Sequence, residues 1–579
     1  AAAEALALAA VVGAPLAIGA VHLPIVLAVA AIGCLAFALL AHSLRGGRVH
    51  AGWLAAALLG VNAWTLLQLV PLPPGLLGGL APATAALYEA AGAGGWRPLS
   101  LDAAATAAQA ARGVGWLCVL AVLQHRASLD RAARRRILAA VALSAGAVAL
   151  IGLGHWLAGE RRVLFGLYEF GAPRPFLSTL GNTNNLSGLL NLGGLVALGL
   201  AAHATERGRR VAGLAIFAAC VAGSILTASR GGAMALLAGL LLLPLVGWGS
   251  RARRASGVRE GWKGWATLGA GAIAATLLAR WLYGAYPRLL REIATLLHFD
   301  PGEEEGKLEA YRIAWDAALA HPIFGIGRGA FESAQALYLS RPWRVTFTHA
   351  ENEPLQALAE LGLPVGAALV GAFAAAWLGL VRRGRRSWAE AGAAAGAFAL
   401  LLQNLVDFSL QFAPGLALLA LFACRARHEI ALPVGAARAL ALAAPLVVGI
   451  AGWRALPGLE HDRDALIAAG ADAGLSLDAV EARARGIRAE RPAWYLPAEV
   501  VATRAAAEPG GAARALPWIN ELLRLHPQGG SGHRLAGEVL AQLGRKSQAL
   551  GEFRRAASLG APSIDRVLAH WPEIGRAHV

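Results

Sequence analysis

Three arginines stand where a guanidinium could bind a phosphate. Arg230 lies in the short turn Ser-Arg-Gly-Gly at 229–232, between two apolar runs that hold it near a membrane surface. Arg312 lies in a long polar stretch, and Arg288, near the start of that stretch, is a weaker candidate. A guanidinium can donate two parallel hydrogen bonds to a phosphate. The alternative for Arg230 is contact with lipid headgroups, but the adjacent glycines allow close backbone approach and favour a binding site.

Groups able to take a proton lie just before another apolar run. His349, Glu351 and Asn352 precede Pro354, which suits the first turn of a helix. A histidine or glutamate at that entrance could remove a proton from a hydroxyl. Helix capping would explain Asn352 and the acid that follows it, but it gives His349 no function. We therefore interpret His349 and Glu351 as alternative acid–base groups.

Asparagines form the last polar group that could contact a substrate. Asn182 and Asn184 occur in Gly-Asn-Thr-Asn-Asn, directly before an apolar run. A carboxamide can bind sugar hydroxyls or cap a helix. Capping explains one asparagine of the group, so we predict a substrate-binding role for Asn182, Asn184 and Asn352.

Several other kinds of site are excluded. The glycines between 325 and 329 are not a nucleotide loop, because no strand precedes them and no βαβ unit follows. The sequence has no P-loop, nucleophile elbow or Asp-x-Asp signature. The four cysteines lie in apolar runs, and no Cys/His cluster suggests a metal. We expect neither a metal nor a cofactor.

Long apolar runs must position these residues. The chain has 579 residues, of which 57% are hydrophobic and 15% charged, with a mean hydropathy of +0.53. A soluble domain carries about 25% charged residues. We therefore predict an all-α polytopic bundle of about 12–13 transmembrane spans, each of about 20 residues. The predicted spans are 5–21, 23–43, 52–70, 104–124, 136–158, 184–204, 210–228, 231–249, 264–283, 354–381, 388–405, 410–425 and 437–455.

The basic residues predict how the bundle is oriented. The net charge is +16, and lysine and arginine gather in alternate connections, which is typical of cytoplasmic loops and not of a nucleic-acid surface. This pattern puts the N-terminus in the cytoplasm. The polar clusters and the long loop 284–353 then face outward, so we predict a membrane domain at 1–458 and an outward C-terminal domain at 459–579.

The C-terminal domain has a helical pattern with an internal repeat. Gly510, Ala515 and Ile519 recur 34 residues later as Gly544, Ala549 and Phe553. This period is typical of tetratricopeptide (TPR) helix pairs. A chance period in an ordinary helical bundle is the alternative.

The motifs, taken in order, resemble the O-antigen ligase and O-antigen polymerase superfamily of bacterial membrane glycosyltransferases. They are Gly-Asn-x-Asn, Ser-Arg-Gly, Arg-x2-Trp with Gly-x-Gly-x-Gly-x-Phe, and His-x-x-Asn followed by Glu-Leu-Gly-Leu-Pro. Gln68-Leu-Val-Pro-Leu-Pro-Pro74 and Pro98-Leu-Ser-Leu-Asp102 also resemble the branch that ends in tetratricopeptide repeats.

The resemblance implies transfer of a glycan from undecaprenyl pyrophosphate to an acceptor hydroxyl at the periplasmic face of the inner membrane. The acceptor would be a lipid A core, a growing polysaccharide or a protein. It implies that Arg230 and Arg312 hold the pyrophosphate. The family often has a second histidine next to the asparagine, where this chain has Glu351, so either Glu351 or His349 would be the base.

Two other functions remain as alternatives. A transporter or flippase for a lipid-linked glycan would share the many spans, but it should carry mid-membrane charges or repeated broken helices. A non-enzymatic scaffold that recruits partners through its repeats would leave the outward arginines and His349 unexplained. The motifs do not separate ligase from polymerase, and they predict membrane lipids and no nucleic acid among the partners.

Overall fold

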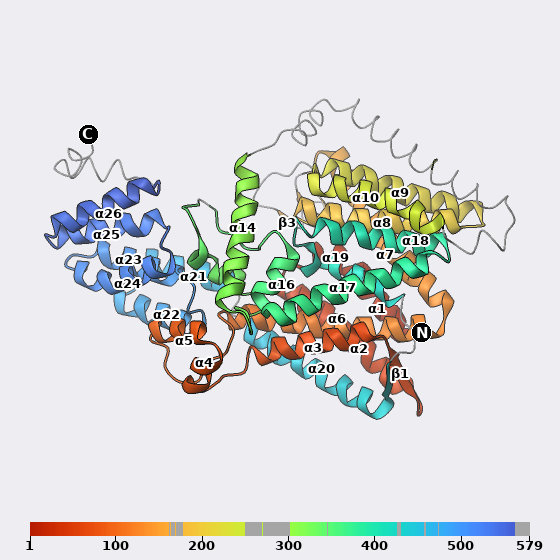
Figure 1. Ribbon diagram of the computed structural model, residues 1–579, viewed down its shortest axis with the longest axis horizontal. Coiled ribbons are helices and arrows are strands. Elements are labelled where there is room, and N and C mark those ends of the chain that lie inside the picture. The colour runs from red at the N-terminus through yellow and green to blue at the C-terminus, as the bar shows by residue number, and fades with distance from the viewer. Residues whose placement is uncertain are drawn as a thin grey trace.

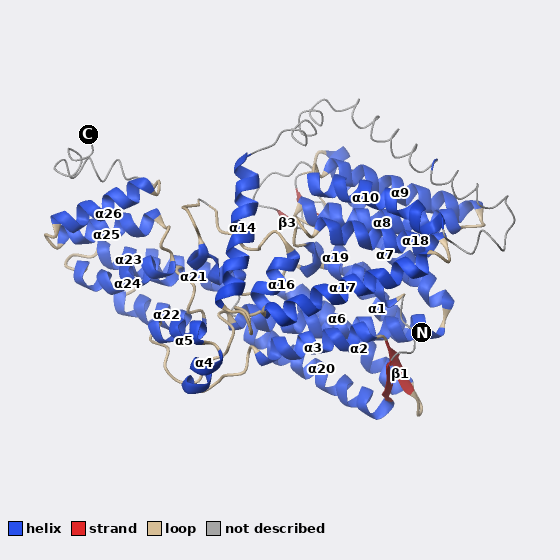
Figure 2. Ribbon diagram, viewed as in Figure 1, coloured by secondary structure: helices blue, strands red, loops and turns tan. Residues whose placement is uncertain are grey.

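A computed structural model provides the fold of the chain. It describes residues 1–160, 162–163, 168–169, 176, 178–248, 269, 301–343, 345–424, 430–456, 459–472 and 474–561. Helices dominate these residues, and the strands are short (Figure 2). The predicted span 264–283 and Arg288 lie outside the described residues, apart from position 269.

The membrane bundle occupies one end of the molecule and the C-terminal helices the other (Figure 1). Eight helices of the described part are long and apolar enough to cross a membrane. These are α2 (Leu23–Ser43), α6 (Ala103–Leu129), α7 (Arg131–Ala158), α8 (Thr183–His203), α9 (Arg207–Leu226), α10 (Arg230–Trp248), α17 (Leu363–Gly384) and α20 (Val434–Ala455).

Four other predicted spans, 5–21, 52–70, 388–405 and 410–425, correspond to shorter helices. They are α1 (Ala2–Leu16), α3 (Trp53–Leu67), α18 (Trp388–Gln403) and α19 (Ala413–Ala423). The prediction of an all-α polytopic bundle is confirmed, and the chain is a multi-pass membrane protein. Within the described residues, eight helices reach the length and composition of a full span, and these four helices of 11 to 16 residues are shorter than the about 20 residues that a span needs.

Small residues allow the central helices to approach closely. Helix α8 packs against α7, α9 and α18 and is buried along most of its length. A Cβ atom on Gly199 would lie 2.7 Å from the Cα atom of Gly392 in α18, and one on Gly193 would lie 2.1 Å from the Cβ atom of Ala145 in α7. In a membrane, where apolar surface alone does not drive helix association, such close packing holds the bundle together.

The predicted span 354–381 is wrong in one respect, because it is two helices. Helix α16 (Glu353–Leu361) ends at Gly362, and α17 begins at the next residue. Gly362 has a φ of 81°, and its Cβ would lie 2.1 Å from the carbonyl oxygen of Ile323. Only glycine fits this close approach with positive φ. Helix α16 therefore belongs to the polar end of the bundle, outside the spanning helix.

Basic and candidate-site residues lie at opposite ends of the bundle. Glu4 is buried and pairs with Arg126 (2.9 Å) and Arg136 (2.7 Å), which joins the starts of α1 and α7 to the end of α6. The short sheet of β1 (Arg48–Ala51) and β4 (Ile430–Pro433), antiparallel with Arg48 opposite Pro433, connects two more of the loops predicted to be cytoplasmic. A second small sheet pairs β2 (Arg162–Val163) with β3 (Tyr168–Glu169).

Four helices and a 3₁₀ turn cover the other end of the bundle. They are α4 (Pro74–Leu80), α5 (Pro82–Ala90), α14 (Pro301–Ala320), α15 (Phe331–Ala334) and the 3₁₀ turn η3 (Gln335–Tyr338). Helix α14 stands upright between the bundle and the C-terminal helices (Figure 1). The loop predicted at 284–353 is thus partly helical, with an apolar core of its own that includes Leu101, Ile313 and Phe331.

The C-terminal domain is a row of helices: α21 (Leu459–Ala471), α22 (Leu477–Glu490), α23 (Leu496–Ala507), α24 (Ala512–Leu525), α25 (Gly530–Gln542) and α26 (Lys546–Ser558). The repeat positions are equivalent in structure. Ala515 and Ala549 are fully buried, and Gly510 and Gly544 both have positive φ in the turns. The assignment to the tetratricopeptide class stays a prediction, as does the division at residue 458.

Candidate active site

The asparagine cluster and the Ser-Arg-Gly turn are bonded to one another. Asn182 caps α8, because its Oδ1 atom accepts the backbone N–H groups of Asn184 (2.8 Å) and Asn185 (3.2 Å). The hydroxyl of Ser229 donates to Oδ1 of Asn184 at 2.7 Å. Asn182 thus has a structural role that helix capping explains, while Asn184 fixes the turn that carries Arg230.

Close packing also fixes the backbone of that turn. A Cβ atom on Gly232 would lie 1.9 Å from Oγ of Ser187 in α8, so this position requires glycine. Arg230 is half-buried and is the first residue of α10. A Cβ atom on Gly231 would lie 3.1 Å from Val406, which belongs to the link between α18 and α19.

That link, residues 404–412, contacts the turn that carries Arg230, the helix that carries Arg312 and the segment that follows His349, and we call it the connecting loop. The carbonyl oxygen of Leu405 accepts the Nδ2 group of Asn352 (2.8 Å) and the hydroxyl of Tyr311 (3.4 Å). The carbonyl oxygen of Asn404 accepts the N–H group of Glu353 at 3.0 Å. Asn352 also caps α16 through the N–H group of Leu355. The sequence interpretation gave this loop no function.

His349 lies against the connecting loop. Its ring stacks on Phe408 with 4.0 Å between ring centroids, and Phe412 meets it edge-on at 5.9 Å. The Nδ1 atom lies 3.0 Å from the hydroxyl oxygen of Thr348. Burial, together with the positive charge of Arg112, lowers the pKa of His349 to about 3. The imidazole is therefore neutral at pH 7, and the lowered pKa also makes it a weaker base than a free imidazole.

Two carboxylates lie near this histidine. Glu351 has a positive φ of 51°, which is uncommon for a residue with a side chain. Asp407 of the connecting loop is almost fully buried, and Gln403 donates to its Oδ2 atom at 3.2 Å. Burial, reinforced by the charge of Glu351, raises the pKa of Asp407 to about 7. The structure brings His349 and Glu351 to the same place, and it adds Asp407, which sequence reasoning missed.

Arg312 is less closely tied to this centre. It lies on α14, 47% exposed, and pairs with Asp316 (3.3 Å) and Glu309 (3.8 Å). The neighbouring Tyr311 provides the contact between α14 and the connecting loop. Arg312 thus lies beside the cluster, with acidic partners of its own.

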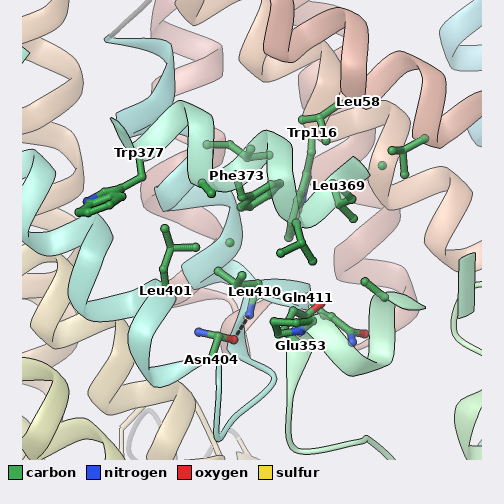
Figure 3. A pocket seen from close by; sticks show the side chains of 18 of the residues that line it. Leu58, Trp116, Glu353, Leu369, Phe373, Trp377, Leu401, Asn404, Leu410 and Gln411 are labelled. Carbon is green, nitrogen blue, oxygen red and sulfur yellow. Dashed lines mark hydrogen bonds between the residues drawn. The ribbon is translucent and has the colours of Figure 1, made fainter. Parts of the chain in front are cut away.

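An apolar cavity of about 340 Å³ opens in the bundle next to the connecting loop (Figure 3). Its walls come from α3, α6, α17, α18 and α19, with Trp116, Phe373 and Trp377 among the larger side chains. One end is polar. The polar lining residues there are Gln109, Arg112, Arg328, Glu353, Asn404 and Gln411.

Two arginines make the polar end suitable for an anion. The guanidinium of Arg112 donates to Oε1 of Gln109 at 3.0 Å and lies 5.7 Å from the ring centroid of Phe412. Arg328 keeps its positive charge, although burial lowers its pKa. Burial, reinforced by the charge of nearby Glu360, raises the pKa of Glu353 to about 8, so Glu353 is largely neutral at pH 7.

Phe412 joins the cavity to His349. The centroid of this ring lies 5.7 Å from the guanidinium carbon of Arg112 and 5.9 Å from the centroid of the imidazole. A molecule with an apolar tail in the cavity and an anionic group at Arg112 would therefore present its next atoms close to His349.

Sequence reasoning missed Arg112, although a signal was present. It is the one charged residue in the predicted span 104–124, and a charge within a span is costly and often functional. Arg328 lies among the glycines at 325–329, to which sequence analysis gave no binding role. No group of three or more His, Cys, Asp or Glu side chains that could hold a metal occurs within the described ranges.

Comparison with known proteins identifies one region that carries part of the candidate site. Residues 214–370 match the family model of O-antigen ligases. No curated protein matches the chain. The match covers Arg230, Arg312 and His349, and it confirms the resemblance to the O-antigen ligase and polymerase superfamily. It supports a glycosyl-transfer function at a membrane, in the synthesis of polysaccharide or lipopolysaccharide.

Proposed function

We propose that this chain, related to the O-antigen ligases, transfers a glycan from a polyprenyl pyrophosphate, such as undecaprenyl pyrophosphate, to an acceptor hydroxyl. The single observation that carries the proposal is the apolar cavity that ends at Arg112 and Arg328, one aromatic ring away from His349. A lipid chain fits apolar walls, and a pyrophosphate fits paired guanidinium groups. A transferred sugar would follow directly after the pyrophosphate.

The reaction breaks one bond and forms another at the anomeric carbon. The acceptor oxygen attacks that carbon, and the bond to the pyrophosphate oxygen breaks, so the electron pair leaves with the lipid pyrophosphate. Negative charge grows on the leaving group as this bond breaks. Guanidinium groups in a site poor in water stabilise that charge. We assign this role to Arg112 and Arg328 beside the cavity, and to Arg230 and Arg312, whose neighbours in the chain contact the connecting loop.

The acceptor proton must move to a base in the same step. The neutral imidazole of His349 can accept it, and Glu351 is the alternative. A positioned base contributes about 10²–10⁴-fold to the rate. Phe408 stacks on the imidazole and holds it in place. The carboxyl of Asp407 interacts with that of Glu351, and it changes its charge near pH 7 because its pKa is raised to about 7.

The orientation and the acceptor complete the proposal. The arginine-rich connections lie at the end of the bundle opposite His349, which supports a cytoplasmic N-terminus and a periplasmic site in the inner membrane. The acceptor is a lipid A core, a growing polysaccharide or a protein hydroxyl. We further predict that the repeat helices of the C-terminal domain bind a protein partner.

A reconstituted transfer assay tests the function. Purified protein in proteoliposomes receives an undecaprenyl-pyrophosphate oligosaccharide and an acceptor glycan, and mass spectrometry sizes the products. The proposal expects consumption of the donor and release of the lipid pyrophosphate. A ladder of repeats identifies a polymerase, and one addition to a foreign acceptor identifies a ligase. Movement of intact donor between leaflets, without cleavage, would overturn the proposal and favour a transporter.

A further inference from the structure

A buried ion pair joins the C-terminal domain to the membrane domain. Arg491 follows α22, and its Nε atom lies 3.4 Å from Oδ2 of Asp102, which precedes α6. The side chains are 1% and 0% exposed. Breaking one partner of such a pair leaves an uncompensated buried charge, which is strongly unfavourable.

Asp102 is bonded on three sides. Its Oδ1 atom accepts the N–H group of Ala105 at 2.9 Å and so caps α6, the helix that carries Arg112. Its Oδ2 atom accepts the hydroxyl of Ser333 at 2.6 Å. Arg491 therefore neutralises a carboxylate that holds both α6 and the 325–339 segment.

That segment carries Arg328, which lines the cavity. The hydroxyl of Thr106 in α6 donates to the carbonyl oxygen of Arg328 at 2.8 Å. The N–H group of Arg328 donates to Oε1 of Gln68 at 3.1 Å, and the Nε2 group of Gln68 donates to the carbonyl oxygen of Phe324 at 2.7 Å. Gln68 and Asp102 thus hold the same segment from two sides.

The residues next to Arg491 also enter this region. Ala493 is fully buried in the apolar core that contains Leu101, Phe331 and Ala350, the residue after His349. Just before Arg491, the carbonyl oxygen of Ala489 accepts the guanidinium of Arg97 at 3.1 Å. The segment 489–495 is therefore part of the core on which the candidate site rests.

We propose that Arg491 is a positioning residue, and that segment 489–495 of the C-terminal domain is a structural component of the transfer site and not a separate tethered module. The expected effect of Arg491 on transfer activity rests on the proposed function, whereas its expected effect on the structure of the 325–339 segment does not. Arg491 acts through Asp102 on Arg328 and Arg112.

Amide hydrogen exchange of the full chain in detergent tests the coupling without a substrate. Arg491→Met leaves Asp102 buried and unpaired, so exchange in 325–339 should rise by about tenfold or more. The double variant Asp102→Asn/Arg491→Met removes that charge, because asparagine is neutral. Asparagine can still accept the N–H group of Ala105, so the cap of α6 is kept. Exchange in the double variant should fall between that of Arg491→Met and that of the wild type.

Arg514→Met is the matched control. Arg514 pairs with Asp478 and Glu481 within the C-terminal domain and is 45% exposed. Amide exchange in 325–339 of Arg514→Met should equal that of the wild type. Equal exchange in Arg491→Met and Arg514→Met would overturn the proposal. If Arg491→Met does not fold, the double variant decides: it should still exceed the wild type in 325–339, and equality would overturn the proposal.

The kinetic arm separates this inference from the proposed function. In the transfer assay, Arg491→Met should lower kcat/KM for the lipid donor by about tenfold, and the double variant should recover part of that loss. An inactive wild-type protein, with exchange as predicted, would contradict the proposed function alone. An active wild type with unchanged kcat/KM and unchanged exchange in Arg491→Met would contradict this inference alone.

Discussion

The imidazole of His349 lies parallel to the ring of Phe408, with 4.0 Å between centroids and 11° between the planes. These residues are far apart in sequence, and the contact brings the segment before α16 onto the connecting loop. The same loop contacts the asparagine cluster, the Ser-Arg-Gly turn and α14 through its backbone or its flanking residues. The loop is thus the structural centre of the candidate site.

Protonation of Asp407 should make the fold more stable in mild acid. Its pKa is raised from 3.8 to about 7 in the folded chain, so folding favours the protonated form. The resulting stability is fully present below the unfolded pKa and is lost as pH rises through about 7, at about 1.4 kcal/mol for each pKa unit. The wild type should therefore lose more thermal stability between pH 5 and pH 8 than Asp407→Asn does. Equal losses, measured by thermal unfolding in detergent, would contradict the pKa shift.

Replacement of Gly232 should disturb the turn that carries Arg230. A Cβ atom there would lie 1.9 Å from Oγ of Ser187, so Gly232→Ala must push α10 away from α8. We expect transfer activity to fall by about tenfold or more. Gly371→Ala is the control, because nothing lies within 4 Å of its Cβ position in α17. Retention of full activity by Gly232→Ala would show that the turn does not need this geometry.

Arg230 should require its guanidinium. In Arg230→Lys the positive charge remains, but a point charge cannot form two parallel hydrogen bonds with a phosphate. We expect loss of most transfer activity, measured at a saturating acceptor concentration with the donor varied. Wild-type kcat/KM for the donor in Arg230→Lys would remove Arg230 from the site.

One of two side chains should be the base. His349→Gln and Glu351→Gln are compared by single-turnover transfer with donor already bound. The variant that loses the base should lose about 10²–10⁴-fold in rate, with little change in donor affinity. His42→Gln, an exposed histidine at the opposite end of the bundle, provides the control. Wild-type rates in both variants would exclude a base at 349–351.

The helical bundle could be predicted from the sequence, and candidate site residues could be proposed from it, because both depend on local patterns. Apolar runs identified the helices, and turns such as Ser-Arg-Gly identified Arg230. The break at Gly362 was missed, because it depends on contact with Ile323 in another segment. Arg328 and Asp407 were missed for the same reason, because each gains its place only when its segment packs against the rest of the site. Arg112 was missed although its charge within an apolar span was visible in the sequence.

The most direct test of the account is the dependence of transfer on Arg112, which sequence analysis did not identify. Initial rates in proteoliposomes are measured against the concentration of undecaprenyl-pyrophosphate oligosaccharide for the wild type, Arg112→Gln and Arg454→Gln. Arg454, exposed at the end of α20, does not line the cavity. The account predicts a loss of about tenfold or more in kcat/KM for the donor in Arg112→Gln alone. Wild-type kcat/KM in Arg112→Gln would contradict the claim that the cavity holds the lipid donor.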